Sequence, residues 1–230
     1  MLLPEDRQRE TRSMPYQAFD THADEYDAWF DREPGATIFA MEAACLQGLL
    51  HRYEKPYLEI GVGSGRFAKA LGVEHGVDPA LSLLEKAKSR GIKVQKASGE
   101  NLPFPDGSFG CVLIALTLCF VDDPPSVLHE AWRVLAPGGG LVLGLILKGS
   151  PWAESYARKG REGHPLYSRA QFFSRSEVDD LLKSSGFEAL DYCSTLLQLP
   201  GRSAYGLERP VPGYRESAGF VGIDSRKRDI

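Results

Sequence analysis

Hydrophobic and polar positions follow two different periods along the chain, and their alternation predicts a regular succession of strands and helices. Short runs that predict strands occupy residues 57–60, 74–79, 92–96, 110–116 and 141–147. Apolar residues at helical spacing lie between them over residues 80–90 and 124–135, and precede them over residues 38–53. Nearly unbroken apolar strands such as residues 110–116 are typical of a parallel sheet covered on both faces. The pattern therefore predicts a doubly wound α/β fold with a mostly parallel sheet.

Two segments that flank this core have a different pattern. Residues 16–30 interleave aromatic side chains with carboxylates, which fits a helix pair packed on the core and also a lid over a ligand site. Residues 148–175 contain six Lys or Arg residues against two Glu residues, together with several aromatic residues. This composition predicts either a solvated helix or a substrate cap whose positive charge suits an acidic acceptor.

The C-terminal part predicts one more helix and two more strands. Ser174 and Glu177 have the spacing of a capping box, so a helix should begin there, run through Lys183 and end at Gly186. Residues 187–196 and 218–223 predict strands that pair antiparallel, with a long loop rich in Pro and Gly between them. Earlier in the chain, Pro-Gly-Gly-Gly at residues 137–140 predicts the end of the helix before the fifth strand.

These elements predict one domain with five segments. The charged residues 1–15 predict disorder, and residues 16–55 predict the lid and a covering helix. Residues 56–147 form the expected ligand-binding core, and residues 148–175 form the cap. Residues 176–230 supply the C-terminal helix and strands.

A glycine-rich turn at residues 61–65 (Gly-Val-Gly-Ser-Gly) joins the first predicted strand to a helix that begins at Arg66. Such a turn lets a ligand's polar groups approach backbone N–H groups and the helix N-terminus, because no Cβ holds the ligand away. A dinucleotide fingerprint, G-x-G-x-x-G, would place its third glycine where Arg66 stands. This difference disfavours an NAD(P)-dependent oxidoreductase, which is kept as an alternative.

An acidic residue, Asp78, ends the second predicted strand. In a doubly wound sheet an acid at this place accepts from the ribose hydroxyls of a bound nucleoside, although Asp before Pro79 also fits a helix N-cap. The glycine turn, Asp78, residues 98–102 and residues 116–118 all follow predicted strands. Because ligands of such sheets bind beyond the carboxyl ends of the strands, these stretches predict one crevice.

Composition narrows the classes of partner. The chain has 230 residues and a formal net charge of −4, which gives no reason to expect nucleic acid as a ligand. Its four cysteines show no C-x-x-C spacing, so no metal site is predicted. Residues 1–10 lack the apolar run of a signal peptide, and no apolar stretch is long enough to span a membrane. We therefore expect a cytoplasmic protein without membrane insertion.

The order and spacing of these motifs resemble the class I S-adenosylmethionine-dependent methyltransferases, especially the branch that includes ubiquinone and menaquinone biosynthesis methyltransferases. The resemblance is carried by residues 58–71 (LEIGVGSGRFAKAL), 76–88 (GVDPALSLLEKAK) and 100–144, and it extends over residues 16–147. It implies a seven-stranded sheet whose last strand is antiparallel and S-adenosyl-L-methionine as cofactor. It also implies a transferase that moves a methyl group in line to a small-molecule acceptor, for which we expect an acidic or aromatic compound.

The resemblance implies roles for individual residues in cofactor binding. The methionine end would be lined by Glu59, Gly61, Gly63 and Gly65. Asp78 would hold the ribose, and Gly99 and Glu100 would border the adenine, with Leu102 against it. Ala115 and Thr117 would lie near the methionine amino group, and Tyr16 and Tyr26 would be contacts from the lid.

Two departures from the family pattern affect the expected chemistry. Ser98 stands where relatives often have an acid that accepts from the adenine amino group. Residues 118–120 (Leu-Cys-Phe) stand where relatives often have a histidine, so no motif supplies a catalytic base. His22 in the lid and His164 in the cap are candidates, because both flank the expected mouth of the site. A non-catalytic partner subunit with the same fold is the second alternative.

Overall fold

An eight-stranded sheet forms the centre of the molecule, with the strand order β3-β2-β1-β4-β5-β8-β6-β7. This computed structural model describes residues 15–228. The strands are β1 (Tyr57–Ile60), β2 (His75–Asp78), β3 (Lys93–Lys96), β4 (Phe109–Ala115), β5 (Leu135–Leu145), β6 (Phe187–Thr195), β7 (Val211–Pro212) and β8 (Phe220–Lys227). Strands β1 to β5 are parallel, and β8 lies antiparallel between β5 and β6. The predicted mostly parallel α/β sheet is confirmed.

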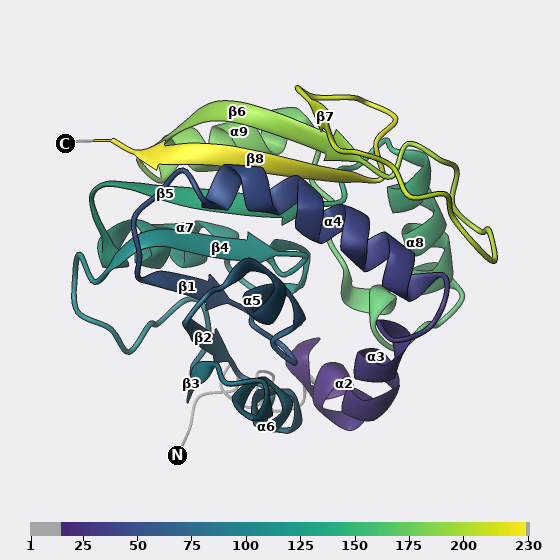
Figure 1. The fold of residues 1–230 in the computed structure, drawn as a ribbon, viewed down its shortest axis with the longest axis horizontal. Helices are drawn as coiled ribbons and strands as arrows, with labels where there is room; N and C mark the ends of the chain where they lie inside the picture. The colour runs from purple at the N-terminus through teal and green to yellow at the C-terminus, as the bar shows by residue number, and fades with distance from the viewer. Residues whose placement is uncertain (1–14, 229–230) are drawn as a thin grey trace, which may run out of the picture.

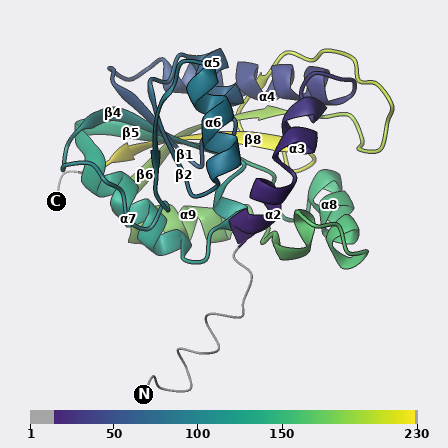
Figure 2. The ribbon, with the colours of Figure 1, turned by 90° about the horizontal axis from the view of Figure 1, so that it is seen from below.

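Helices cover both faces of this sheet (Figure 2). The helices α4 (Gly35–Leu50) and α5 (Arg66–Leu71) lie on one face, and α7 (Pro124–Val134) and α9 (Arg175–Ser184) lie on the other. The helix α6 (Leu81–Ser89) packs on β2 and β3. Ser174 caps α9 through the predicted capping box with Glu177. This arrangement is the doubly wound architecture expected from the sequence.

The central strand β4 shows how one sheet supports two hydrophobic cores. Its side chains alternate between the faces, as the pleat requires. Val112 and Ile114 pack in the core that also contains residues of α7 and α9. Cys111 and Leu113 pack in the core that contains residues of α4 and α5. Both faces of β4 are therefore removed from water, which explains its nearly continuous apolar sequence.

Other helical segments gather at the end of the molecule toward which β1 and β4 point (Figure 1). They are α2 (Pro15–Thr21), α3 (Ala23–Trp29), α8 (Pro151–Arg161) and the short 3₁₀ helices η1 (Leu118–Phe120) and η2 (Tyr167–Arg169). Residues 15–29 thus form a helix pair, which we term the lid, and α8 with η2 lies in the segment that we term the cap. The predicted disorder covers residues 1–15, and all of these except Pro15 lie outside the described residues.

The sheet has one strand more than the seven expected. The two-residue strand β7 interrupts the long C-terminal loop and pairs antiparallel with β6, Val211 opposite Ser194 and Pro212 opposite Cys193. A strand this short has no hydrophobic period to detect, and Pro212 disfavours a strand in sequence reading. Its place at the edge of the sheet accommodates the proline, because an edge residue need not donate to a further strand.

The start of β5 is a second difference from the prediction. The helix α7 ends at Val134, before the glycine run, and β5 begins at Leu135. Phe109 of β4 lies opposite Leu135 of β5, but Cys111 lies opposite Gly140. The register therefore shifts between these two pairs, and residues 136–139 form an irregularity inside β5. A Cβ at Gly140 would overlap the ring of Tyr53. Close packing of this ring, rather than a helix stop, accounts for that glycine.

Truncation of a core side chain should show how much burial on both faces of the sheet contributes to the free energy of unfolding. Leu113 on β4 is fully buried, so Leu113→Ala should lower the free energy of unfolding by about 2–5 kcal/mol. The matched control is Leu190→Ala on β6, where the leucine is 45% exposed and the expected change is within about 0.5 kcal/mol. Urea unfolding of both variants measures the difference. Equal losses at the two positions would contradict this assignment of the core.

Candidate functional site

A cavity of about 860 Å³ lies at the carboxyl ends of β1, β2 and β4. Its floor is formed by the glycine turn, the end of β2, the loop after β3 and the loop after β4. Side chains of α2 and α3 form one wall, and α8, η2 and the following residues form another. The stretches that the sequence predicted to converge therefore do line one crevice.

The glycine turn adopts a backbone that residues with side chains rarely take. Gly61, Gly63 and Gly65 have φ angles of 73°, 50° and 79°, all in the left-handed region. Gly61 and Gly63 line the cavity, whereas Gly65 lies behind it. A Cβ at Gly65 would approach the Cα of Ala87 to 2.9 Å. Two glycines thus shape the surface of the cavity, and the third permits close packing of the turn against α6.

The chain turns sharply after β4 and brings a threonine against the glycine turn. Leu116 has a φ of 54°, an unfavourable conformation for leucine, and its N–H donates to the carbonyl of Gly144 at 2.8 Å. The next residue, Thr117, donates from Oγ1 to the carbonyl of Ala115 at 3.0 Å. A Cβ at Gly61 would collide with the Thr117 side chain. Gly61 is therefore needed for packing within the floor as well as for ligand access.

The carboxyl of Asp78 accepts hydrogen bonds from two backbone N–H groups. Its Oδ2 accepts from the N–H of Gly63 at 2.9 Å, and its Oδ1 accepts from the N–H of Ala80 at 2.8 Å. Burial outweighs these hydrogen bonds and raises the pKa of Asp78 to about 6. Each oxygen keeps a second lone pair for a further donor. Asp78 thus lines the cavity at the end of β2 and bonds to the start of α6, and its contact with a ribose stays a prediction.

Glu59 on β1 lies beneath the glycine turn and also lines the cavity. It is buried, and its Oε2 has no hydrogen-bond partner in the described part of the chain. Burial raises the pKa of this carboxyl well above its usual range. A buried acceptor without a donor is unfavourable. An amino group such as that of the implied cofactor would satisfy it, so Glu59 and the glycine turn fit that group.

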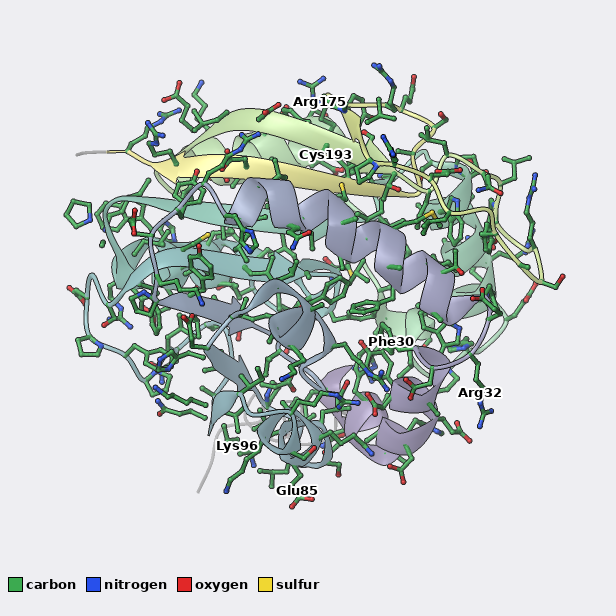
Figure 3. All side chains as sticks on the ribbon, in the orientation of Figure 1. Phe30, Arg32, Glu85, Lys96, Arg175 and Cys193 are labelled. Atoms are coloured by element: carbon green, nitrogen blue, oxygen red, sulfur yellow. The ribbon has the colours of Figure 1, made fainter. Side chains whose placement is uncertain are left out.

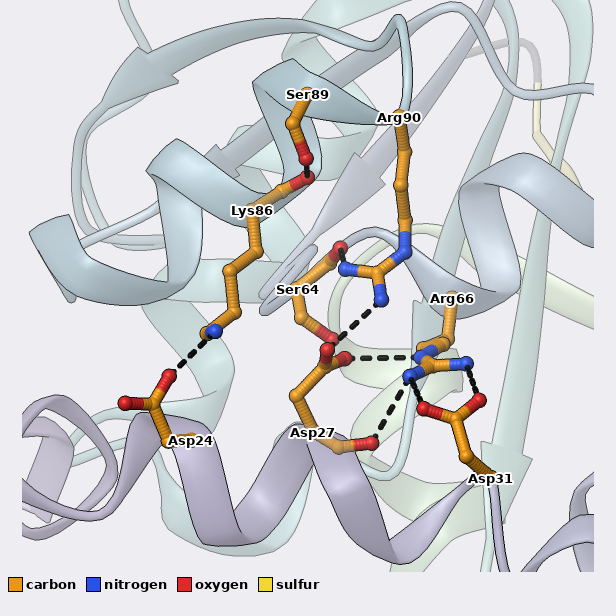
Figure 4. Close-up of polar contacts among 8 residues, drawn as sticks. All are labelled: Asp24, Asp27, Asp31, Ser64, Arg66, Lys86, Ser89 and Arg90. Atoms are coloured by element: carbon orange, nitrogen blue, oxygen red, sulfur yellow. Dashed lines mark hydrogen bonds and ion pairs between the residues drawn. The ribbon is translucent and has the colours of Figure 1, made fainter.

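The lid is fastened to the floor by a cluster of ion pairs (Figure 4). Asp27 on α3 accepts from Nε of Arg66 and from a terminal nitrogen of Arg90, each at 2.8 Å. Asp31 binds the same Arg66 at 2.6 and 2.7 Å. Burial alone would raise the pKa of Asp27, but hydrogen bonds from the two arginines hold it well below its usual range.

Aromatic rings extend the contact between the lid and the core. Phe30 packs edge-on against Tyr26 and Phe39, with ring centroids 5.4 Å apart in each pair, and Phe39 packs on Phe67 of α5 at 5.0 Å. Figure 3 shows Phe30 directed into the molecule, while Arg32 points outward. The interleaved aromatic and acidic residues of the lid therefore have separate tasks, packing and ion pairing.

The cap forms the wall opposite the lid. Tyr156 of α8 and Tyr167 of η2 have ring centroids 4.6 Å apart, and His164 lies 4.5 Å from Tyr167. The N–H of Leu166 donates to Nδ1 of His164, so the ring proton is assigned to Nε2. Of the six basic residues of this segment, Lys159 lines the cavity and the others do not. The positive charge of the cap therefore faces mostly away from the cavity.

Most of the predicted cofactor contacts lie together on the cavity surface. They are Tyr16, Tyr26, Glu59, Gly61, Gly63, Asp78, Ser98, Gly99, Glu100, Ala115 and Thr117. Gly65 and Leu102 lie outside the lining, and Leu102 packs in the core. Both candidate bases, His22 and His164, line the cavity, and His22 pairs with Glu25 at 3.4 Å.

A buried carboxyl group in the cavity was missed in the sequence. Glu42 of α4 lines the cavity and is 3% exposed. It lies on the apolar face of its helix, four residues after Ile38 and three before Cys45. A carboxylate at this position of an amphipathic pattern is a detectable signal, because buried charges are rare unless they have a partner or a function.

Residues 15–228 contain no group of three or more His, Cys, Asp or Glu side chains placed to hold a metal ion. None of the helices in this range is long and apolar enough to cross a membrane.

Comparison with known proteins identifies the family of this core. The family model described as a methyltransferase domain matches residues 58–143. A crystal structure from Thermotoga maritima, described as an S-adenosylmethionine-dependent methyltransferase and possible histamine N-methyltransferase, is 36% identical in sequence. The alignment covers 93% of this chain and 100% of that one, with a TM-score of 0.85.

Two curated relatives add to this comparison. An uncharacterised protein of Mycobacterium tuberculosis is 44% identical over 94% of this chain and 76% of its own length. The demethylmenaquinone methyltransferase of Thermus thermophilus is 39% identical over 41% of this chain and 48% of its own length. The second match falls in the branch that the motifs resemble.

Removal of the central carboxylate of the lid cluster should loosen the lid. Asp27 is 13% exposed, so Asp27→Asn removes the charged acceptor that two arginines share and should lower the free energy of unfolding by about 2–3 kcal/mol. The control is Asp24→Asn on the same helix, where the pair with Lys86 involves a 94% exposed carboxylate and should contribute less than about 1 kcal/mol. Urea unfolding, with hydrogen exchange of α3, measures both.

The difference in unfolding free energy between the wild type and Asp27→Asn should depend on pH. Because the folded-state pKa of Asp27 is lowered, its stabilisation is complete above its unfolded value, near pH 4. The stabilisation is lost as the pH falls through the lower folded-state pKa. The gap between wild type and Asp27→Asn should therefore shrink on acidification. A gap that is the same at neutral and strongly acidic pH would contradict the ion-pair explanation.

Proposed function

The chain belongs to the family of S-adenosylmethionine-dependent methyltransferases, and on that basis we propose that it methylates a small-molecule acceptor by in-line transfer. The observation that carries this proposal is the single continuous cavity, which joins the glycine turn to an aromatic chamber between lid and cap. Its volume of about 860 Å³ lies within the range of small-molecule sites. A small acceptor also agrees with the Thermotoga maritima relative, whose named candidate acceptor is histamine.

Cofactor binding is assigned to residues of the floor. S-adenosylmethionine, when bound, supplies a methyl group on a positively charged sulfur. Glu59 offers its unsatisfied oxygen to an amino group, and Asp78 offers free lone pairs to hydroxyl groups. Ser98, Gly99 and Glu100 border the same crevice on the side of β3, where we place the adenine.

The contribution of the remaining residues is to orient the reactants and exclude water. The rings of the lid and cap surround the space beyond the glycine turn with apolar surface. Fixing two reactants in line can lower the barrier by about 7–11 kcal/mol. Exclusion of water also removes a competing nucleophile and assists the loss of charge at sulfur.

The described residues give no reason to prefer an oxidoreductase. Arg66, which stands in place of the third glycine of a dinucleotide motif, is engaged by Asp27 and Asp31 of the lid. Its side chain is therefore part of the closed site, and its replacement by glycine would remove the contacts that hold α3.

Calorimetric titration with S-adenosylhomocysteine, followed by transfer assays with methyl-labelled S-adenosylmethionine, tests the proposal. We expect micromolar binding and label transfer to at least one small amine, acid or phenol in a screen. NADH in place of the ligand is the control and should not bind. A folded protein that fails to bind S-adenosylhomocysteine would contradict the cofactor assignment, and binding without transfer to any acceptor would favour a partner subunit.

Replacement of Asp78 tests the ribose assignment. Asp78→Ala should weaken S-adenosylhomocysteine binding by about 1–3 kcal/mol, because a charged acceptor is lost. Since the pKa of Asp78 is about 6 and hydroxyl donors favour its ionised form, wild-type affinity should fall as the pH drops below that value. The variant should lack this dependence. Unchanged affinity in a variant that unfolds at the wild-type temperature would exclude the assignment.

A further inference from the structure

The cavity contains a carboxyl group that is not among the proposed cofactor contacts. Glu42 is 3% exposed and lines the cavity. Across residues 15–228, no hydrogen bond or ion pair reaches its carboxyl, whereas Asp27 and Asp78 are each bound by two donors. Burial raises the pKa of Glu42 to about 8. An acid kept in such a place without a partner is suited to a ligand that brings donors of its own.

Three tyrosines from three different elements line the same cavity as this carboxyl. They are Tyr26 of α3, Tyr156 of α8 and Tyr167 of η2, and all three line the cavity. Burial above all, with Glu42 among the charges that add to it, raises the pKa of each hydroxyl. At neutral pH the rings are therefore uncharged. Their faces can attract a cation, as aromatic rings do in sites for ammonium groups.

Tyr26 connects this chamber to the cofactor half of the cavity. Its ring lies 4.0 Å from the position that a Cβ on Gly63 would take. Burial first, and then Tyr167, Asp78, Glu59 and Glu42, raise the pKa of its hydroxyl. A group bound at Glu42 would share the wall residue Tyr26 with the cofactor half, so we place it in the acceptor half of the site.

No described cation occupies this position. The exposed Lys159 lies over the ring of Tyr156, 5.2 Å from its centre, without an ion pair to Glu42. His164 accepts at Nδ1, and its pKa is lowered first by burial and then by Lys159 and His22. Cys45 is the other titratable group facing Glu42, from the same helix. The interior therefore offers a buried carboxyl and no buried cation among the described residues, which disfavours the acidic acceptor that the composition of the cap suggested.

We propose that Glu42 and the three tyrosine rings that line the cavity with it form the acceptor subsite, and that this subsite takes a primary or secondary amine carried on an apolar body. The inference rests on the proposed methyltransferase function and names the acceptor class of the same site. The carboxyl accepts hydrogen bonds from the N–H groups of the amine. The rings contact its positive charge and its apolar body, so one ligand satisfies both parts of the subsite.

The same arrangement supplies the proton transfer that an amine acceptor requires. An amine enters as ammonium, and its nitrogen has a free electron pair only after one N–H bond has broken and its proton has moved to a Glu42 oxygen. That pair then forms the bond to the methyl carbon while the carbon–sulfur bond breaks, and the electrons of that bond stay on sulfur. The products are a methylated ammonium ion and neutral S-adenosylhomocysteine. The proton on Glu42 passes to water when the product leaves.

Binding to the protein saturated with S-adenosylhomocysteine tests the acceptor class without requiring turnover. The probes are 2-phenylethylamine and 3-phenylpropanoate, which have similar shape and opposite charge. We expect the amine to bind and the acid to bind much more weakly. Glu42→Gln should weaken amine binding by roughly 30-fold or more, because the charge partner is lost. The matched control is Glu85→Gln, on the outer side of α6 (Figure 3), which should leave the affinity unchanged.

Proton release on binding adds a readout from the wild-type protein alone. At neutral pH the carboxyl of free Glu42 is mostly protonated and the free amine is an ammonium ion. In the complex, the carboxyl and the amine together hold one proton fewer than they do before binding. Calorimetry in two buffers of different ionisation enthalpy should therefore show close to one proton released per amine. Binding to Glu42→Gln should release no proton. If that variant does not fold, the number of protons released by the wild-type protein tests the inference by itself.

Three outcomes would overturn the inference. They are preferential binding of 3-phenylpropanoate, amine binding that Glu42→Gln leaves unchanged or that releases no proton, and absence of amine binding at millimolar concentration. Titration of S-adenosylhomocysteine separates these failures from failure of the proposed function. If this ligand binds the wild type and Glu42→Gln alike, the cofactor site stands and only the acceptor class is wrong.

Discussion

The ion pairs around Asp27 are the interaction on which the closed site depends. Arg66 begins the helix that follows the glycine turn, and Arg90 follows the end of α6. These are the two elements whose close contact Gly65 permits. One carboxylate thus joins the lid to both elements that shape the cofactor half of the cavity. Because this carboxylate is largely removed from water, the loss of both arginines would leave an unfavourable buried charge.

The end of β4 imposes a second constraint on the same region. The left-handed conformation of Leu116 directs the chain across the floor, so that Thr117 comes to lie against Gly61. The hydrogen bond from Leu116 to Gly144 fixes this turn to the neighbouring strand. The shape of the cavity floor therefore depends on the central strands, whose side chains are packed on both faces of the sheet. A rigid core holds the strained turn in place.

Local signals in the sequence predicted the strands, the glycine turn and the crevice, because these depend on period, on glycine and on the common edge of parallel strands. The short strand β7 and the irregular start of β5 were missed because they depend on pairing with distant residues. The lid cluster was missed for a related reason, since nothing local links Arg66 to Asp27, 39 residues away. Glu42 was different, because its position on the apolar face of α4 was visible in the pattern.

Tyr26 and Asp27 are neighbours on one short helix, and this adjacency links events in the two halves of the cavity. Asp27 sets where α3 lies over the floor, and Tyr26 contributes to the walls of both halves. Under the proposed function, a cofactor and an acceptor would both contact this short helix. A ligand that favoured one position of α3 would then change the affinity of the other half, and by thermodynamic reciprocity the second ligand would change the affinity of the first by the same factor.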